Sequence, residues 1–273
     1  MRGSLGDKIG EGAYADVHAW APGQVVKLYK AGFPRLHTWW EARMIRAVFA
    51  AGAPAPEVLE EVTLEGRFGI VLTRLDGPTL LQLSRSGATT PEQTGTILAA
   101  LVISVHKIAP PPDVPFLRDR MGSVLRHSHG FPEHIATGIL ALIERLAPGD
   151  GLCHGDVHPG NVIMTADGPR LIDWDGATRA PAALDLASCH VTNSEVAPET
   201  VDDPERPRAN NAAMQSEYAR LAGMSPEALA AAMEPYQSII RVFILLGAVG
   251  SRPGLRQRLI QRIEAALRSQ DQF

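Results

Sequence analysis

The first quarter of the chain alternates hydrophobic and polar positions with the two-residue period of half-buried β-strands. This alternation predicts strands at Ile9–Trp20 and Gln24–Tyr29, separated by a Pro-Gly turn. It predicts a second pair at Val58–Leu64 and Phe68–Leu75, again with a glycine in the turn between them. We therefore expect a small β-rich unit at the start of the chain.

One main helix is expected between these two strand pairs. Thr38 is a suitable N-cap, Glu41 follows three positions later as in a capping box, and Gly52 lies just past the end. The small unit then combines a sheet with a single helix.

After Asp76-Gly77-Pro78 the hydrophobic period becomes that of helices. Helices are expected at Thr94–Ile108, Phe116–His127 and Pro132–Leu146, and over Pro181–Phe273 except for a polar stretch from Asn193 to Asn211. A short hairpin, Val162–Met164 with Arg170–Ile172, interrupts them. The pattern predicts an α+β protein with a β-rich lobe, residues 1–76, and a larger, mostly helical lobe, residues 77–273.

The strongest chemical signal is the segment HGDVHPGN at residues 154–161, followed by LIDWDGA at residues 171–177. Transfer of a phosphoryl group requires an aligned hydroxyl and cations that absorb the charge spreading over the transferred group. Asp156 offers a carboxylate to orient or accept the hydroxyl proton. Asn161 and Asp173 offer the oxygen ligands that Mg²⁺ prefers, and the hairpin places both at one end. A simpler interpretation is that Asp156 and Asn161 are turn-forming loop residues and that Asp173 ends a strand.

These two motifs resemble the aminoglycoside phosphotransferase group, a superfamily that also contains choline, homoserine and fructosamine kinases. The resemblance extends from about Ile9 to Asp185. It implies a bilobal protein-kinase-like fold, Asp156 as catalytic base, and Asn161 and Asp173 as magnesium ligands. It also implies that His154 braces the catalytic loop and that Asp185 anchors it, although a helix N-terminus favours a carboxylate at Asp185 equally well.

A second signal lies near the N-terminus, where Gly10 and Gly12 stand in the sequence IGEGAYADV. Glycines between strands let the backbone approach phosphates, although Ala15 replaces the third glycine of the kinase pattern. Lys27 lies inside an apolar strand, where an unpaired charge is unfavourable. The resemblance gives Lys27 the α- and β-phosphates of the nucleotide and Glu41 as its ion-pair partner, which we favour over the capping box.

An apolar strand running into Gly77-Pro78 resembles the hinge of kinases, which binds adenine through backbone groups. Thr73 and Leu75 are the hinge residues we expect. His106, near a helix end, is expected to be structural, and the glycines and proline around His158 argue against a zinc-binding helix with His154.

Composition limits the partners. A net charge of -4 and a pI near 6.1 argue against a nucleic-acid surface. The longest apolar runs, Ile97–Val105 and Phe243–Val249, are far shorter than the roughly 20 residues of a membrane span. The N-terminal residues carry no apolar stretch typical of a signal peptide, and Cys153 and Cys189 form no disulfide framework. We expect a cytoplasmic protein without membrane or nucleic-acid partners.

The sequence thus predicts a small-molecule kinase that transfers the γ-phosphate of ATP or GTP, with Mg²⁺ as cofactor, to a hydroxyl group. The short segment Trp174–Leu184 leaves little room for the peptide platform of a protein kinase, and the intact set of site residues argues against a non-catalytic nucleotide-binding protein. Between His190 and Pro235, eight acids stand against three arginines. If this region lines the acceptor site, a cationic acceptor such as an aminoglycoside is favoured. The alternative for this region is an acidic surface exposed to solvent. The alternative for the enzyme is a metabolic kinase of choline, homoserine or sugar type. For Asp175 two roles stay open: contact with the acceptor, or binding of a second metal ion.

Overall fold

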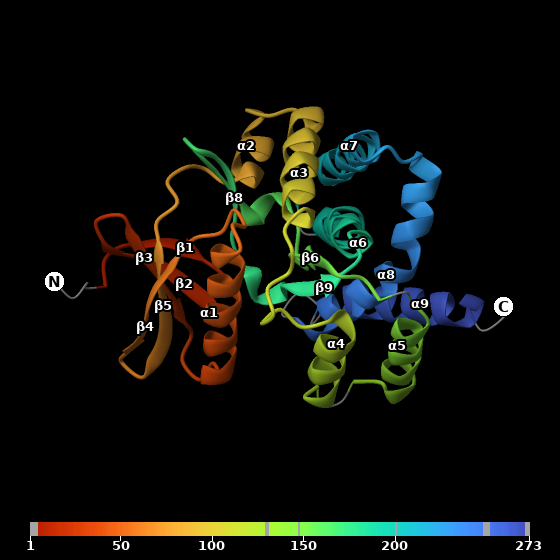
Figure 1. The fold of residues 1–273 in the computed structure, drawn as a ribbon, viewed down its shortest axis with the longest axis horizontal. Coiled ribbons are helices and arrows are strands. Elements are labelled where there is room, and N and C mark those ends of the chain that lie inside the picture. The colour runs from red at the N-terminus through yellow and green to blue at the C-terminus, as the bar shows by residue number, and fades with distance from the viewer. Residues whose placement is uncertain (1–4, 129–130, 147, 200, 248–251, 271–273) are drawn as a thin grey trace.

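A five-stranded antiparallel sheet of strand order β1-β2-β3-β5-β4 forms the N-terminal part of the computed structural model (Figure 1). Its strands are β1 (Lys8–Glu11), β2 (Ala15–Ala21), β3 (Gln24–Tyr29), β4 (Val58–Leu64) and β5 (Arg67–Thr73). The structure describes residues 5–128, 131–146, 148–199, 201–247 and 252–270. Residues 1–4, part of the segment on which a signal peptide was judged absent, lie outside this range, as does the end of the apolar run Phe243–Val249.

The predicted strand Ile9–Trp20 is two strands. The Gly12 N–H donates to the Ala15 carbonyl (2.8 Å), which closes a tight turn between β1 and β2. The turn between β4 and β5 is as predicted: Glu65 and Gly66 both have positive φ, 50° and 77°, as a type I′ hairpin turn requires.

The main helix, α1 (Arg35–Ala50), begins earlier than predicted. Pro34 occupies the N-cap position, and its side chain makes no capping hydrogen bond. Thr38 lies inside the helix and is only 2% exposed. The predicted capping box of Thr38 and Glu41 is therefore wrong, because the helix already begins at Arg35 and Glu41 is ion-paired with Lys27 instead.

The larger lobe is mostly helical (Figure 1). Its helices are α2 (Leu80–Ser86), α3 (Pro91–His106), α4 (Leu117–Arg126), α5 (Glu133–Arg145), α6 (Ala183–Val191), α7 (Glu205–Ala222), α8 (Pro226–Leu246) and α9 (Pro253–Gln270). A π-helical turn, Thr192–Val196, and a 3₁₀ turn, Ala197–Glu199, follow α6. The expected break over Asn193–Asn211 is thus partly wrong, because α7 begins inside it with its polar residues hydrogen-bonded to neighbouring helices.

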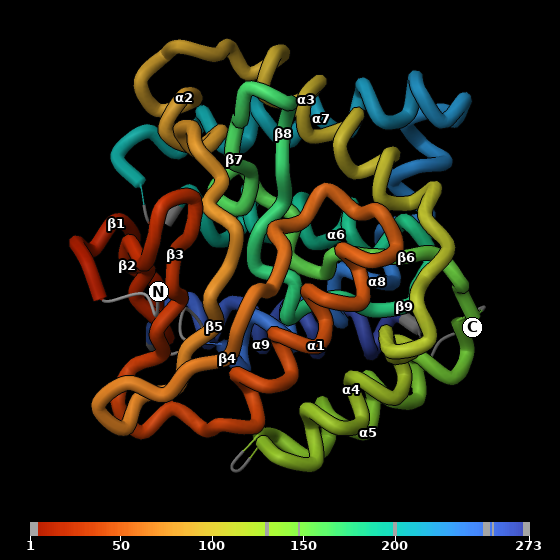
Figure 2. The backbone as a smooth tube through the Cα atoms, turned by 60° about the vertical axis from the view of Figure 1, so that its left-hand side comes forward, coloured from red at the N-terminus to blue at the C-terminus, as the bar shows by residue number. Residues whose placement is uncertain are grey.

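Two short strand pairs carry the loops of interest. β6 (Gly151–Cys153) pairs with β9 (Thr178–Ala180), and β7 (Val162–Thr165) pairs with β8 (Gly168–Leu171), which is the predicted hairpin. Two 3₁₀ turns, Pro159–Asn161 and Trp174–Gly176, precede β7 and follow β8. In Figure 2 this hairpin lies beside the chain that leaves β5, in accord with the hydrogen bond from Met164 N to Pro78 O (2.9 Å).

The predicted architecture is therefore confirmed: a β-rich lobe with one main helix and a larger helical lobe. The predicted domain boundary after residue 76 falls in the connection between the end of β5 and the start of α2. It stays a prediction.

Candidate active site

Lys27, in the middle of the sheet, points toward carboxylates of both lobes. It pairs with Val17 on β2 and Ile70 on β5, so it projects from the central strand β3. Its Nζ donates to Glu41 Oε1 of α1 (2.7 Å) and also forms an ion pair with Asp173. Burial alone would lower the lysine pKa, but the two carboxylates hold it well above its ordinary value. Lys27 therefore carries a charge that links the sheet, the helix and the turn after β8.

Glu41 has the deepest burial of this set, with 5% of its side chain exposed. The Tyr29 hydroxyl donates to its second carboxylate oxygen. Burial raises the pKa of Glu41, and the charge of Lys27 opposes that shift. The ion pair with Lys27 thus forms in place of the capping box.

The loop after β6 is held by a buried carboxylate on α6. Asp185, in the first turn of that helix, accepts hydrogen bonds from the N–H groups of His154 (2.9 Å) and Gly155 (2.7 Å). His154 Nδ1 accepts from Asp156 N–H (3.2 Å), and its Nε2 donates to Ile172 O (2.9 Å). Burial lowers the pKa of His154, so the ring is the neutral form that these two bonds require. Both sequence interpretations of Asp185 hold, since it anchors the loop from a helix N-terminus.

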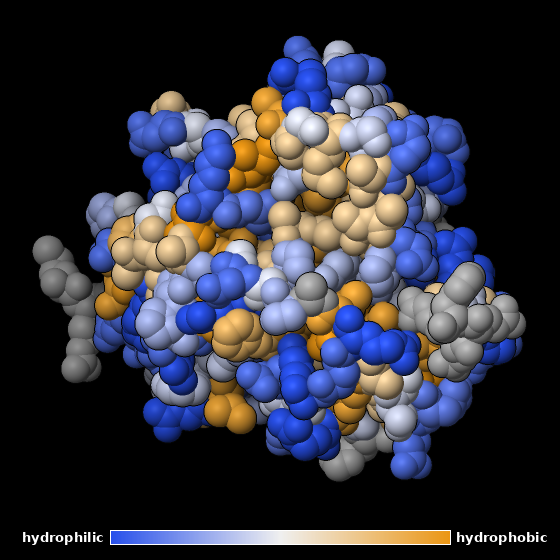
Figure 3. Space-filling view, turned by 45° about the vertical axis from the view of Figure 1, so that its right-hand side comes forward, coloured by the Kyte–Doolittle hydropathy of each residue, from blue (hydrophilic) through white to orange (hydrophobic). Residues whose placement is uncertain are grey.

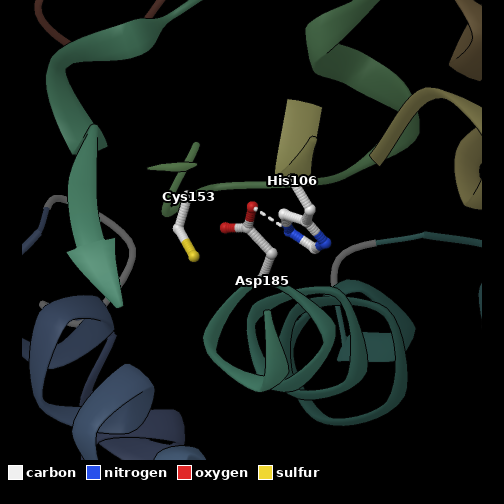
Figure 4. A group of neighbouring side chains, drawn as sticks. All are labelled: His106, Cys153 and Asp185. Atoms are coloured by element: carbon white, nitrogen blue, oxygen red, sulfur yellow. Dashed lines mark hydrogen bonds and ion pairs between the residues drawn. The ribbon is translucent and has the colours of Figure 1, made fainter. Parts of the chain in front are cut away.

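Figure 4 shows the same carboxylate beside His106 and Cys153. His106 Nε2 contacts Asp185 Oδ2 at 3.1 Å, and its Nδ1 contacts the Tyr218 hydroxyl at 3.1 Å. Burial raises the pKa of the Cys153 thiol well above its ordinary value, so it stays protonated. These contacts make His106 the hydrogen-bonded structural histidine that the sequence predicted.

Asp156 projects from this loop into solvent, with half of its side chain exposed (51%). Asn161 Nδ2 donates to the Asp156 carbonyl (3.0 Å) and carboxylate (3.3 Å), and His158 Nε2 lies 3.6 Å from the same carboxylate. Burial by the surrounding protein tends to raise the pKa of Asp156, but His158 and Asn161 hold it below its ordinary value. The carboxylate is thus ionised and accessible, as a proton acceptor must be.

Asn161 and Asp173 lie at the same end of the hairpin. Ile172 N donates to Asn161 O (3.0 Å), so Asp173 follows directly on the residue paired with Asn161. The amide nitrogen of Asn161 is committed to Asp156, and its Oδ1 accepts no hydrogen bond in the described part of the chain. The Lys27 charge outweighs burial and lowers the pKa of Asp173. An ionised carboxylate and a free amide oxygen are hard donors that fit Mg²⁺.

The remaining predicted residues lie in the sheet or directly next to it. Gly10 pairs with Val17, and Val17 pairs with Lys27, so Gly10 and Lys27 share one row of the sheet. The φ of neither Gly10 nor Gly12 is positive, so backbone conformation does not require glycine at either position. Thr73 ends β5, and its N–H is already donated to Glu57 O (3.0 Å). Of the hinge pair, Leu75 follows the strand in the connection to α2.

Sequence reasoning missed two side chains beside the site, Trp40 and Arg120. Both donate to the main-chain carbonyl of Asp175, at 3.1 Å and 3.2 Å. Asp175 is exposed at the surface, but the protein around its carboxylate displaces water, and this desolvation together with the Asp173 charge raises its pKa. No local motif marks either donor, since they lie 135 and 55 residues from Asp175 in sequence.

The acidic excess predicted after His190 is partly neutralised. Glu195 is buried between Arg241 (2.7 Å) and Arg262 (2.8 Å), both outside the counted segment. Further pairs join acids to arginines within it: Asp203–Arg206, Glu205–Arg208 and Glu217–Arg220. Arg206, Arg208 and Arg220 are already in the count, so only Arg241 and Arg262 add positive charge to this region, and both lie at Glu195.

Comparison with known proteins decides the family, because a model of the phosphotransferase enzyme family matches residues 11–224. The chain belongs to this family. The match includes strands β2 to β5, the loop after β6 and the hairpin of β7 and β8, which confirms the resemblance carried by the two motifs. It also confirms the classification as a phosphotransferase with a hydroxyl acceptor.

Curated relatives in this family match over a short segment. The thiamine kinases of Escherichia coli (strain K12) and Shigella boydii are 42% identical over 59 residues, which is 22% of this chain. That match covers only a fifth (20%) of the length of those relatives.

Solved structures share the fold along most of the chain. A putative fructosamine-3-kinase from Haemophilus somnus 129PT has a TM-score of 0.63 at 13% identity, covering 96% of this chain and 91% of that one. The phosphotransferase APH(3'')-Id of Streptomyces rimosus, in complex with ADP and streptomycin, has a TM-score of 0.52 at 19% identity, covering 85% of this chain and 94% of that one. At these identities the likeness establishes the protein-kinase-like fold.

Among the described residues, α8 alone is long and apolar enough to cross a membrane by length and composition. Half of its most apolar window is buried inside the protein, and it packs against α6 and α9. It also carries buried Arg241, which pairs with Glu195. In the face shown in Figure 3, hydrophilic residues surround smaller hydrophobic areas. These features are typical of the core helix of a folded domain.

Proposed function

We propose that this protein is a kinase that transfers the γ-phosphate of ATP or GTP to a hydroxyl group of a small molecule. The observation that carries the proposal is the convergence of Lys27, Asp156 and Asp173: Lys27 is ion-paired with Asp173, and Asp156 is ionised beside Asn161. Family membership supports the same reaction class.

In this proposal each side chain has one task. Lys27 binds the α- and β-phosphates when the nucleotide displaces its contact with Asp173, while Glu41 keeps the lysine in place. Asp156 orients the acceptor hydroxyl and takes its proton. Gly10 and Gly12 leave room for the phosphates. The carbonyl of Thr73 and the N–H of Leu75 bind the base, since the Thr73 N–H is already used.

Asn161 and Asp173 would hold Mg²⁺, which supplies the positive charge that stabilises the transferring phosphoryl group. The fixed Asn161 amide supports this assignment, because its anchored nitrogen leaves the oxygen to bind a cation.

The acceptor we propose is a small molecule that carries both a hydroxyl and a cationic group. The exposed Asp175 carboxylate makes no side-chain hydrogen bond or ion pair within the described residues and is close enough to Asp156 for their charges to interact, so it can pair with an ammonium. Thiamine, aminoglycosides and choline all combine these two groups, and the local match to thiamine kinases makes thiamine the second candidate beside an aminoglycoside. The short connection through β9 to α6 leaves no platform for a peptide, which argues against a protein substrate.

The test is phosphate transfer to a panel of aminoglycosides, thiamine, amino alcohols and neutral sugars, with ATP or GTP and Mg²⁺, read as an added phosphate by mass spectrometry. Asp156→Asn should lower kcat by two orders of magnitude or more while nucleotide binding stays within about twofold. Asp167→Asn, at the distant hairpin turn, is the matched control. Full activity of Asp156→Asn would remove this residue from the mechanism.

A further inference from the structure

The carbonyl oxygen of Asp175 is held by donors from both lobes. Trp40, the residue before Glu41 on α1, donates its indole N–H at 3.1 Å. Arg120, on α4, donates from Nη2 at 3.2 Å. In Figure 1 α1 stands between the sheet and the helical lobe, with α4 on the far side of the boundary. One backbone atom of the turn Trp174–Gly176 is thus bound to both parts of the molecule.

This turn begins immediately after Asp173, whose backbone is strained. Asp173 has φ 66° and ψ 60°, a left-handed conformation unfavourable for a residue other than glycine. Such a conformation persists only where neighbouring contacts hold it. Trp174 supplies one set of contacts, since its indole donates to Leu171 O (2.9 Å) and its ring packs on His154. Trp40 and Arg120, which donate to the Asp175 carbonyl, supply the other set.

Both donors are themselves fixed. The Arg120 guanidinium lies 4.6 Å from the centre of the Phe243 ring on α8. Trp40 lies on α1 directly before Glu41, which is ion-paired with Lys27. Their position relative to Asp175 is therefore set by the packing of α1, α4 and α8.

We propose that Trp40 and Arg120 are positioning residues: they hold the Asp173 turn in the conformation that binds metal, and they tie that turn to both lobes. Neither reaches the reacting atoms; both act through the backbone of Asp175. The role in metal binding rests on the proposed function, but the restraint on the turn does not.

The first experiment needs no ligand. Hydrogen exchange of the turn amides, among them Ala177 N–H, which bonds Trp174 O (3.0 Å), is compared in W40F and W39F. Both substitutions remove an indole N–H from the same helix. Trp39 is 44% exposed and its indole makes no hydrogen bond within the described residues. W40F should exchange about 3–10-fold faster in the turn, the effect of one hydrogen bond, and W39F should match wild type. Equal exchange in the two variants would overturn the proposal.

The second experiment measures the Mg²⁺ concentration that gives half-maximal phosphate transfer. W40F should raise it about 3–10-fold with kcat at saturating Mg²⁺ near wild type, whereas a merely structural role would lower kcat and leave the midpoint in place. R120K, which keeps a donor, should stay closer to wild type than R120M. W40F combined with R120M should exceed the product of the single effects, because the two donors share one acceptor.

An unchanged midpoint in W40F would overturn the metal-positioning role. If wild type transfers no phosphate but the turn still exchanges faster in W40F, the proposed function fails and the restraint stands.

Discussion

Asp185→Asn should destabilise the protein strongly, although the two side chains have nearly the same size. Asp185 is fully buried and accepts hydrogen bonds from His154 N, Gly155 N and His106. An asparagine amide offers one oxygen where the carboxylate offers two, so its NH₂ must face a donor. Hydrogen bonds to a charged group contribute about 1.5–3 kcal/mol, and a buried donor without an acceptor costs about 1–3 kcal/mol. We expect the free energy of unfolding to fall by about 2–4 kcal/mol.

Urea unfolding followed by circular dichroism measures this loss. Asp150→Asn is the matched control, because Asp150 is 73% exposed and lies 3.5 Å from Arg179. The control should stay within about 0.5 kcal/mol of wild type. A loss below about 1 kcal/mol in Asp185→Asn would refute the view that this carboxylate anchors the loop after β6.

The difference between wild type and Asp185→Asn should also depend on pH. Burial opposes ionisation of Asp185, but His106 and the loop N–H groups hold its pKa below the ordinary value of 3.8. Because the folded pKa lies below the unfolded one, the carboxylate contributes its full stabilisation above about pH 5 and loses it as the pH falls through the folded pKa. The stability difference should therefore shrink below about pH 4, and a difference that stays constant down to pH 3 would contradict this reasoning.

Two further substitutions test local features by the same unfolding assay. Thr38→Val should leave stability unchanged or raise it by up to about 1 kcal/mol, because the buried Thr38 hydroxyl has no hydrogen-bond partner among the described residues; a loss of about 1 kcal/mol would contradict this and indicate a hydrogen bond to that hydroxyl. Gly155→Ala should cost at least about 2 kcal/mol, since φ is 86° and a Cβ would overlap the Gly176 carbonyl oxygen. Gly168→Ala, at φ 107° with no atom within 4 Å, should cost only about 1 kcal/mol, and equal losses in both would count against the close approach of the two loops.

The sequence predicted the elements whose signal is local. Period-two alternation located the strands, and the turn at Glu65-Gly66 fixed a hairpin. The motif HGDVHPGN and the hairpin behind it placed Asn161 and Asp173 at one end, as the Ile172–Asn161 hydrogen bond shows. These features are short-range, so residue types and spacing were sufficient.

The features that were missed depend on contacts between distant segments. Nothing near Arg120 in sequence distinguishes it from a surface arginine until α4 is packed against the turn after β8. The start of α7 was missed because its buried residues are polar: Asn210 bonds Ser84, and Asn211 bonds His190. The charge count could not include Arg241 and Arg262 for the same reason, since they reach Glu195 from helices outside the segment.

The most direct test of the central claim is a crystal structure with Mg²⁺ and a non-hydrolysable ATP analogue. The account predicts a metal ion on Asn161 Oδ1 and the Asp173 carboxylate, Lys27 moved from Asp173 to the α- and β-phosphates, and the γ-phosphate facing Asp156. A nucleotide bound elsewhere, or a metal ion that contacts neither Asn161 nor Asp173, would contradict it.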